Sequence, residues 1–379
     1  MKNGAKVDLR EIPSIIGGDK KSRHGVVLAK SISAKKYGIR TGEPVVNAFR
    51  KCPNLAMEPP NHRMYREKSQ KLMEYLRGFT TKIEQVSVDE CYLDFTDIAD
   101  RFPSPLDAAF LMKNGIRERF GFTVNIGISE NKLLAKMASD FEKPDKVHTL
   151  FLREVPVKMW PLPLGELFMA GRSSVEALKK LEINTIGDLA NADLSLIELH
   201  LKSHGKMLWE FANGIDHSPV QWEQAEAKGI GNSTTLAEDA ATYEEVREVF
   251  AGLAESVGRR LRKAGQKANM VSMEIKYHDF QSISHQTQLS KPTSDEQVLL
   301  DTACRLFQEA WTGEPVRLLG IRTAKLVDAG EPEQMSIFDL EPQKPVDEKR
   351  QRLNAAMNQI RKKYGDDAVM KASRMKKVK

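Results

Sequence analysis

The sequence predicts a protein of several domains that combines helices with β-sheets, and three observations point to this class. A chain of 379 residues exceeds one ordinary hydrophobic core, so two to four domains are expected. Candidate strands and helices alternate over the first 150 residues, which is typical of an α/β or α+β domain. Residues 156–216 carry helix signals without a strand candidate, and residues 235–328 combine a long helix with alternating strands.

The first 150 residues contain the clearest alternation. A strand is expected over 24–32, followed by a short basic helix over 33–38 that Gly38 can end. A second helix is expected at about 62–78, because apolar residues there are spaced to form one stripe, namely Leu72, Met73 and Leu76. The further elements are a helix at about 105–120, a strand over 122–129 and a helix over 131–140.

After Pro144 the character of the sequence changes. Helix signals interrupted by Gly171 and Gly187 indicate a small helical domain, and a polar connector with glycines follows it. Beyond the connector the expected elements are a helix at about 242–264 and strands over 271–280 and 315–327. The remainder contains a Pro-rich polar linker, a charged helix and a basic end.

Composition excludes several classes of protein. No apolar run is long enough to span a bilayer, and the first residues lack the apolar stretch of a secretory signal, so the expected location is the cytoplasm. Cys52, Cys91 and Cys304 lack paired spacing, which argues against a disulfide framework and a zinc site. A net charge of +6 and a pI near 9.0 favour a polyanionic partner, although charge alone is a weak indication.

The stretch SVDECYLDFTD, residues 87 to 97, places carboxylates among residues typical of a buried strand. Val86 and Val88 fall on one strand parity, whereas Cys91 and Leu93 fall on the other, so a turn or bulge is expected at Asp89–Glu90. Such a break would let both carboxylates converge on one cation, and Mg²⁺ prefers oxygen ligands of this kind. A solvent-facing acidic turn of a hairpin is the alternative.

The same stretch resembles the S-x-D-E-x-Y-L-D signature of the Y-family DNA polymerases, in the DinB or polymerase IV branch, which is UmuC-like. An ordered series of segments extends the similarity from about Leu9 to Val327: 23–44 resembles the fingers segment, 51–69 and 123–145 resemble palm motifs, and 160–190 resembles the thumb. The resemblance implies a DNA-directed DNA polymerase of the translesion type. Such an enzyme adds deoxynucleotides to a primer opposite damaged template by two-metal phosphoryl transfer.

The implied fold is α+β, a right hand in which the palm and fingers are N-terminally incomplete. The resemblance assigns 1–155 to palm and fingers, 156–220 to a helical thumb with a helix-hairpin-helix, 221–234 to a linker, 235–328 to an α/β little finger and 329–379 to a clamp-binding peptide with a C-terminal helix. The implied partners are primer-template DNA, deoxynucleoside triphosphates and a sliding clamp. The chain is expected to act as a monomer, and no membrane is expected among its partners.

The resemblance also implies roles for individual residues. Asp89 would bridge two Mg²⁺ ions, and Glu90 would complete the site and help deprotonate the primer 3′ hydroxyl. For Asp94, a charge that closes the strand end is favoured over catalysis.

Two lysines are implied in triphosphate binding. Lys143 matches the lysine that grips the incoming triphosphate, where it would oppose developing negative charge. Lys35 stands where many family members carry an arginine that clamps the γ-phosphate, so a looser grip is expected. Lys136 either touches template phosphate or is solvated.

The DNA-binding residues are expected in two places. A hairpin between two short helices exposes backbone amides that can hold a phosphate, at Gly171, Arg172, Ser173 and Ser174, and an ordinary helical hairpin is the alternative. In the last domain, one parity of a strand would face solvent or DNA, at Ser272, Glu274, Lys276 and His278.

The segment QMSIF, residues 334 to 338, resembles the peptide by which polymerases dock on the sliding clamp. Ile337 and Phe338 would fill a pocket while Gln334 orients the peptide. A linker that packs back on the chain is the alternative.

One part of the family pattern has no counterpart in residues 1–10. Family members open with a strand whose first aspartate binds both metals and whose aromatic residue excludes ribonucleotides. Asp8 lies in a segment that matches a later loop, so it is not expected to replace that aspartate. Either the true start of the protein lies upstream of residue 1, or the competing hypothesis holds, a catalytically inactive protein that binds damaged DNA and the sliding clamp. A nucleotide cyclase built on the same palm would not explain the thumb.

Overall fold

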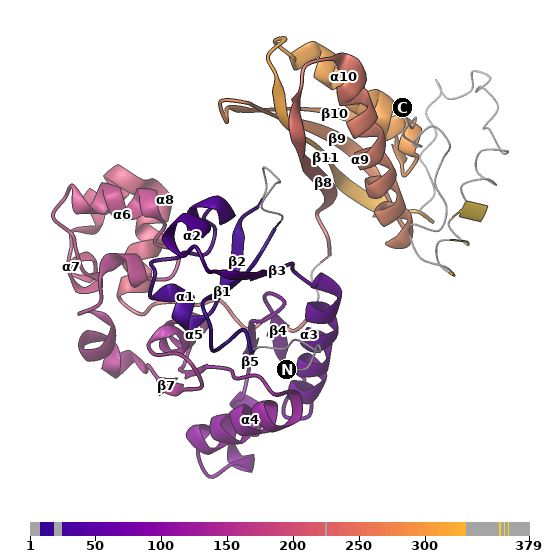
Figure 1. Ribbon diagram of the computed structural model, residues 1–379. Helices are drawn as coiled ribbons and strands as arrows, with labels where there is room; N and C mark the ends of the chain where they lie inside the picture. Colours follow the sequence, from indigo (N-terminus) through magenta and orange to yellow (C-terminus); the bar gives the residue numbers. More distant parts are fainter. Residues whose placement is uncertain are drawn as a thin grey trace. The chain divides into compact units, whose positions relative to one another are not determined.

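The computed structural model describes residues 8–18, 25–223 and 226–330, together with Ala356, Met357, Ile360 and Lys363 (Figure 1). The chain forms two compact units, Met1–Glu226 and Ala227–Lys379. No helix among the described residues is long and apolar enough to cross a membrane.

The first unit begins with a small three-stranded sheet that has its own core. β1 (Ser14–Gly17) lies between β2 (Val27–Lys30), to which it is antiparallel, and β3 (Ala56–Glu58), to which it is parallel. Two helices, α1 (Ile32–Lys35) and α2 (Val45–Lys51), accompany this sheet. Its core consists of small and branched side chains such as Ile15, Val27 and Val45. The short helix expected near residue 33 is confirmed, and it begins after the N-cap Ser31.

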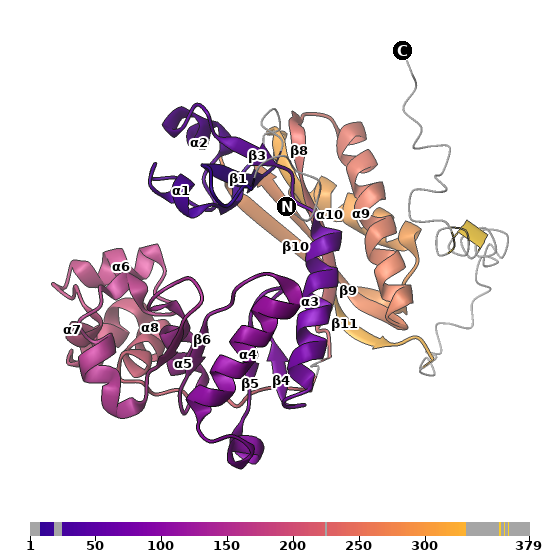
Figure 2. The same cartoon turned by 60° about the horizontal axis from the view of Figure 1, so that its bottom comes forward.

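A second core forms where α3 (His62–Arg77) and α4 (Pro105–Phe120) pack against each other (Figure 2). Both helices begin at a side-chain cap, Asn61 for α3 and Ser104 for α4, which accepts a backbone N–H of the first turn. The predicted apolar stripe of α3 is buried here, as are Met112 and Ile116 of α4. Both predicted helices are confirmed.

A β-hairpin packs on the same core and agrees with the prediction in part. β4 (Ile83–Gln85) pairs antiparallel with β5 (Cys91–Leu93), and a 3-10 helix (Thr96–Arg101) follows. The strand expected on both sides of the break at Asp89–Glu90 is observed only after it, as β5, whereas Val86 and Val88, which were expected on a sheet face, are 55% and 47% exposed. These two valines belong to the turn of the hairpin, so their parity carries no information about a sheet face.

Helix α5 (Lys132–Asp140) connects a two-stranded parallel sheet, β6 (Ile126–Ile128) and β7 (Val147–Thr149), to a helical core. The apolar side of α5 is buried with residues of α6 (Arg172–Lys179), α7 (Ile186–Ala190) and α8 (Leu194–Ala212). Short turns of other helix types span Leu152–Glu154, Val155–Met159 and Leu164–Glu166. The strand-free character expected for the described residues 156–216 is confirmed.

The segment after α8 runs back along the first unit and is fixed there by polar contacts. Asn131 Nδ2 donates to the carbonyl of Gly214 at 2.9 Å, and the backbone N–H of Leu133 donates to Asp216 Oδ2 at 3.1 Å. Further on, the N–H of Gln221 donates to Glu84 Oε2 at 2.8 Å. The N-terminal end of α5 and strand β4 therefore both hold this segment.

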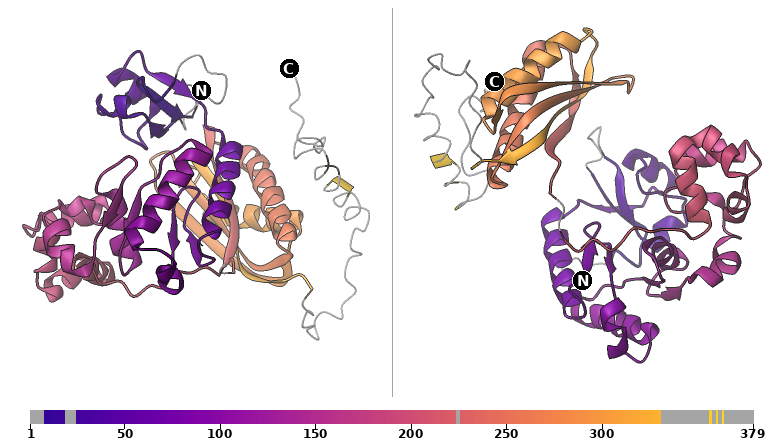
Figure 3. Two further views of the ribbon diagram at one scale, coloured as in Figure 1. Left: turned by 90° about the horizontal axis from the view of Figure 1, so that it is seen from below. Right: turned by 180° about the vertical axis from the view of Figure 1, so that it is seen from behind.

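The second unit is an antiparallel four-stranded sheet with two helices on one face (Figure 3). Strand order is β10 (Ser282–Thr293), β9 (Gln266–Tyr277), β11 (Val316–Asp328) and β8 (Gly229–Ala240), and the helices are α9 (Tyr243–Lys263) and α10 (Glu296–Ala310). Phe250 and Phe307 are fully buried at the centre of the core. The expected parity of β9 is confirmed, because Val271, Met273 and Ile275 face the core.

Candidate active site

The acidic motif lies in the turn between β4 and β5. The backbone N–H groups of Val86 and Ser87 donate to the carbonyl of Glu90 at 3.0 and 3.1 Å, which closes the turn. Ser87 Oγ accepts from the N–H groups of Asp89 at 3.3 Å and Glu90 at 3.0 Å, and it donates to Asp89 Oδ1 at 2.7 Å. One serine hydroxyl thus shapes the backbone and orients the first carboxylate. The expected tight turn at Asp89–Glu90 is confirmed.

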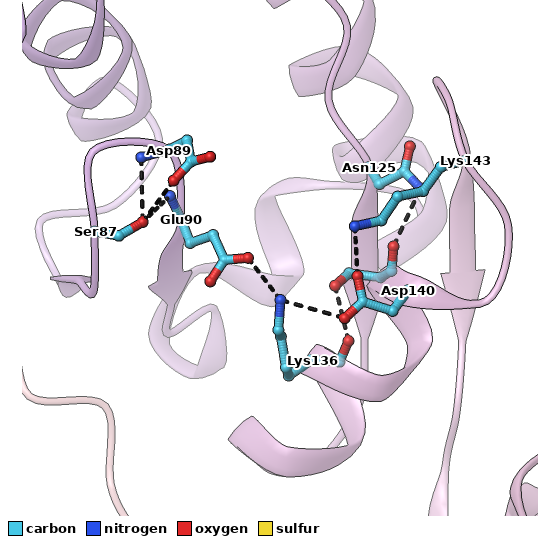
Figure 4. Close-up of polar contacts among 8 residues, drawn as sticks. Ser87, Asp89, Glu90, Asn125, Lys136, Asp140 and Lys143 are labelled. Atoms are coloured by element: carbon cyan, nitrogen blue, oxygen red, sulfur yellow. Dashed lines mark hydrogen bonds and ion pairs between the residues drawn. The ribbon is translucent and has the colours of Figure 1, made fainter. Parts of the chain in front are cut away.

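The two carboxylates of this turn have different partners. Asp89 stays with Ser87, whereas the Glu90 side chain extends to helix α5 and accepts from Lys136 Nζ at 2.6 Å (Figure 4). Both residues are exposed. The two carboxylates therefore do not meet at one point in this structure, and their convergence on a cation stays a prediction. A lysine from α5 already supplies the counter-charge that convergence would have required.

Lys136 is the first link of a row of alternating charges along α5. Its Nζ lies 3.3 Å from Asp140 Oδ2, one helical turn away, and Asp140 Oδ1 lies 2.5 Å from Lys143 Nζ. Burial lowers the pKa of Lys136, but the hydrogen bond from Lys136 to Glu90 and the nearby charges outweigh it, so this pKa is raised. Burial raises the pKa of Asp140, but the hydrogen bonds and positive charges of Lys143 and Lys136 together outweigh it, so this pKa is lowered. We call Glu90, Lys136, Asp140 and Lys143 the charged row.

Asn125 fixes the backbone that carries the end of this row. Its Nδ2 donates to the carbonyls of Ser139 at 3.1 Å and Glu142 at 2.6 Å, and its Oδ1 accepts from the N–H of Lys146 at 3.2 Å. Lys143 lies between these anchored residues. The backbone position of Lys143 is thus set independently of its own side chain.

Helix α5 lies unusually close to strand β6, and Gly127 makes this approach possible. A Cβ built at Gly127 would lie 1.9 Å from the carbonyl oxygen of Ala135 and 2.6 Å from the backbone nitrogen of Ser139. No side chain fits at that position without a shift of the helix backbone. Gly127 therefore determines how closely α5, which carries Lys136 and Asp140, packs on strand β6.

The donors of the acidic turn can be compared with the needs of a divalent cation. Mg²⁺ prefers oxygen ligands and is commonly bound by one or two carboxylates together with substrate phosphates and water. Asp89 and Glu90 provide carboxylates of this kind and fit in donor type and number. Within the described ranges, no group of three or more His, Cys, Asp or Glu residues could hold a metal ion.

Two other predicted residues lie outside the charged row. Lys35 is exposed in the last turn of α1, next to the three-stranded sheet and its separate core. Asp94 follows β5, and its Oδ1 accepts from the N–H of Thr96 at 2.9 Å. Hydrogen bonds from the Thr96 side chain and from this N–H lower the pKa of Asp94. This contact agrees with the structural role at the strand end that was expected for Asp94.

The segment predicted to bind a DNA phosphate forms the start of α6, and its binding role stays a prediction. Gly171 is the N-cap, so the backbone N–H groups of Arg172, Ser173 and Ser174 lie in the first turn, where a helix has no internal acceptor. The Arg172 side chain is 92% exposed and pairs with Glu176 at 2.7 Å, whereas Ser174 is buried. The clamp-peptide residues Gln334, Ile337 and Phe338 lie outside the described residues.

Sequence reasoning missed Asp140 and Asn125. Asp140 had a signal, since it stands four residues after Lys136 and three before Lys143, and both spacings place side chains on one helix face. Asn125 had none, because its contacts depend on the packing of β6 beside the end of α5.

Comparisons with known proteins agree on one family. A model of the impB/mucB/samB family matches residues 2–140, and the model of its C-terminal domain matches residues 227–337. The chain is 44% identical over 377 residues to DNA polymerase IV of Clostridium acetobutylicum, covering 100% of this chain and 94% of that protein. It is 38% identical over 371 residues to DNA polymerase IV 1 of Bacillus subtilis, covering 97% and 88%.

A solved structure is similar in fold. The Y-family DNA polymerase chimera Dbh-Dpo4(243-245)-Dbh superimposes with a TM-score of 0.73 and covers 84% of this chain and 92% of that one. The sequence identity is 21%, so this likeness concerns the fold, and it confirms the expected α+β right-hand class.

Proposed function

The chain belongs to the DNA polymerase IV branch of the Y-family DNA polymerases, and from this membership we propose that it extends a primer opposite damaged template bases. The reaction is the template-directed transfer of a deoxynucleotide to the primer 3′ hydroxyl, which makes the protein a translesion polymerase of DNA repair. The observation that carries the proposal is the charged row, which joins the acidic turn to the lysine expected at the triphosphate (Figure 4).

We assign the chemistry of the site to the turn and to α5. Asp89 and Glu90 would hold Mg²⁺, whose charge would stabilise the negative charge that develops on the transferred phosphoryl group. Lys143 is 58% exposed, and its ammonium has three N–H donors, of which Asp140 uses one. Two donors remain for triphosphate oxygens. Lys35 is assigned to the same triphosphate as a more loosely held charge.

The DNA-binding surface is assigned to both units. In the first unit, the N–H groups at the start of α6 suit a phosphate of the DNA backbone, and such a contact does not depend on the base sequence. In the second, the face of β9 that points away from the core carries exposed Glu274 with partly exposed Ser272 and Lys276, and exposed His278 follows the strand. Contacts of this type make binding sensitive to salt.

The finer organisation is also a proposal. We assign residues 1–155 to palm and fingers, 156–220 to the thumb, 221–234 to the linker and 235–328 to the little finger. Residues 334–338 are assigned to sliding-clamp binding. We further propose that the chain acts as a monomer in the cytoplasm, where its DNA and nucleotide substrates are found.

The test is primer extension with Mg²⁺ and four deoxynucleotides, on an undamaged template and on one that contains an abasic site. Asp89→Asn should abolish extension on both, because it removes a carboxylate charge with little change in shape. Asp97→Asn is the matched control, since Asp97 is an exposed carboxylate of the same segment that pairs with Lys82 at 2.5 Å. Asp97→Asn should extend normally.

The alternative function is a catalytically inactive protein that binds damaged DNA and a sliding clamp, and no observation of the structure favours it. Binding of the primer-template by the unaltered chain without any extension would establish that alternative. Extension that survives Asp89→Asn would refute the assigned site while leaving the polymerase activity in place.

A further inference from the structure

We propose that Asp140 is a positioning residue for the incoming nucleotide, which it serves by orienting Lys143. The inference rests on the proposed function, because it assumes that Lys143 binds the triphosphate. Asp140 is the last residue of α5, and its two carboxylate oxygens have separate partners, Lys143 on Oδ1 and Lys136 on Oδ2. Asp140 therefore connects the two lysines of the charged row.

The donor count allows Asp140 to hold Lys143 while a nucleotide is bound. An ammonium has three N–H donors, and the contact of 2.5 Å with Asp140 uses one of them. The Lys143 side chain is 58% exposed, so its remaining donors are accessible to a polyanion. Asp140 and the triphosphate thus bind different hydrogens of the same group, and Asp140 acts as an orienting partner rather than a competitor.

The location of Asp140 is unfavourable for the helix itself. A negative charge in the last turn of a helix opposes the helix dipole, and Asp140 is the only charged residue that α5 carries in its last turn. Partial burial also disfavours its charged form. The two lysines offset both effects. Any stabilisation that this carboxylate provides therefore comes from its ion pairs and not from the helix.

The backbone on both sides of Lys143 is held by hydrogen bonds, so the Lys143 side chain is the part that can still change conformation. Asn125 anchors the carbonyls of Ser139 and Glu142, and Lys113 and Arg117 anchor the carboxylate of Asp145. A lysine side chain has several rotatable bonds and loses considerable rotamer entropy when it is fixed. A partner that restricts these rotamers in advance lowers the entropic cost of binding the triphosphate.

The expected effect is modest and specific. An exposed ion pair of this type contributes little, so its loss should weaken deoxynucleotide binding about two- to fivefold. The maximal rate of incorporation should change less than twofold, because Asp140 does not touch the reacting atoms. Asp140→Glu should retain part of the binding, since it keeps a carboxylate within reach of Lys143.

Single-turnover incorporation on a primer-template, measured over a range of deoxynucleotide concentrations, separates nucleotide Kd from maximal rate. We would compare the unaltered chain with Asp140→Asn, Lys143→Met and the double variant. If Asp140 acts only through Lys143, the double variant should have the Kd of Lys143→Met alone. Glu142→Gln is the matched control, because Glu142 is a neighbouring acidic residue that pairs with Lys146 at 3.2 Å, and its Kd should be unchanged.

The outcomes distinguish this inference from the function on which it rests. No incorporation by the unaltered chain overturns both. Incorporation with an unchanged or lower Kd in Asp140→Asn overturns the positioning role alone, as does a double variant in which the two effects simply add. Thermal unfolding of Asp140→Asn should match that of the unaltered chain, and a large loss of stability would instead assign Asp140 a structural role.

Discussion

Replacing Asp145 by asparagine should destabilise the first unit, because it leaves a buried ammonium without its counter-charge. The Lys113 side chain is 6% exposed, and its Nζ lies 2.9 Å from Asp145 Oδ1. Removing one partner of a buried ion pair costs about 3–5 kcal/mol. Asp145 is 22% exposed, so water reaches part of the pair, and we expect about 2–3 kcal/mol for this site.

Asparagine is the appropriate replacement because of the backbone at this residue. Asp145 has φ of +61°, a conformation that asparagine and aspartate tolerate better than other residues with a side chain. Arg117→Met is the matched control. Its guanidinium contacts the other oxygen of Asp145 at 2.8 Å but is 50% exposed, so its loss should cost at most about 1 kcal/mol.

The effect of pH has a definite sign. The hydrogen bond from Lys113 is the main cause of a pKa of Asp145 below its usual value of 3.8. The pair therefore contributes its full stability above that value, and the contribution is lost as the pH falls through the lower pKa of the folded state. The difference in stability between the unaltered chain and Asp145→Asn should be constant from about pH 5 to 8 and should shrink below about pH 4.

Urea unfolding followed by tryptophan fluorescence measures this loss. The chain has four tryptophans, and a Trp311→Phe background confines the signal to the first unit, which holds Trp160, Trp209 and Trp222. A loss below about 1 kcal/mol for Asp145→Asn, or an equal loss for Arg117→Met, would refute the argument from burial.

Two further predictions concern the surroundings of the site. Gly127→Ala should displace α5, because the added Cβ would lie 1.9 Å from a backbone oxygen, and it should lower nucleotide incorporation more than about tenfold. Gly165→Ala is the control and should be active, because its added Cβ meets no atom within 4 Å. A fully active Gly127→Ala variant would contradict this reasoning. Burial raises the pKa of the Cys91 thiol to about 11, so at pH 8 iodoacetamide should label this thiol about 100-fold more slowly in the folded chain than in urea. Mass spectrometry measures the rate of labelling at Cys91. Rapid labelling of the folded chain would exclude a buried thiol.

The sequence predicts helices well where local signals define their ends. The helix expected at 62–78 is observed as His62–Arg77, and the one at 105–120 as Pro105–Phe120, because each has a polar N-cap and a glycine after its last turn. The strand expected just before Asp89 is wrong for a local reason as well. Three-residue strands are too short for parity to be informative, and the serine-bonded turn occupies the positions that parity assigned to the sheet.

The candidate site is predictable only in part. Asp89, Glu90 and Lys143 follow from motifs, whereas the link between them does not. Lys136 meets Glu90 from 46 residues away, and that contact depends on how α5 packs on β6. No local pattern in the sequence encodes such a distance.

Helix α5 has two unlike sides, and this has a consequence for genetics. Leu133, Leu134 and Met137 are buried with residues of α6, α7 and α8, while Lys136 and Asp140 belong to the charged row. A substitution that leaves a cavity in that helical core should therefore displace α5, and with it Lys136 and Asp140, before it unfolds the protein. In a growth selection under DNA damage, temperature-sensitive alleles should gather in this core, and their phenotype should imitate that of active-site alleles.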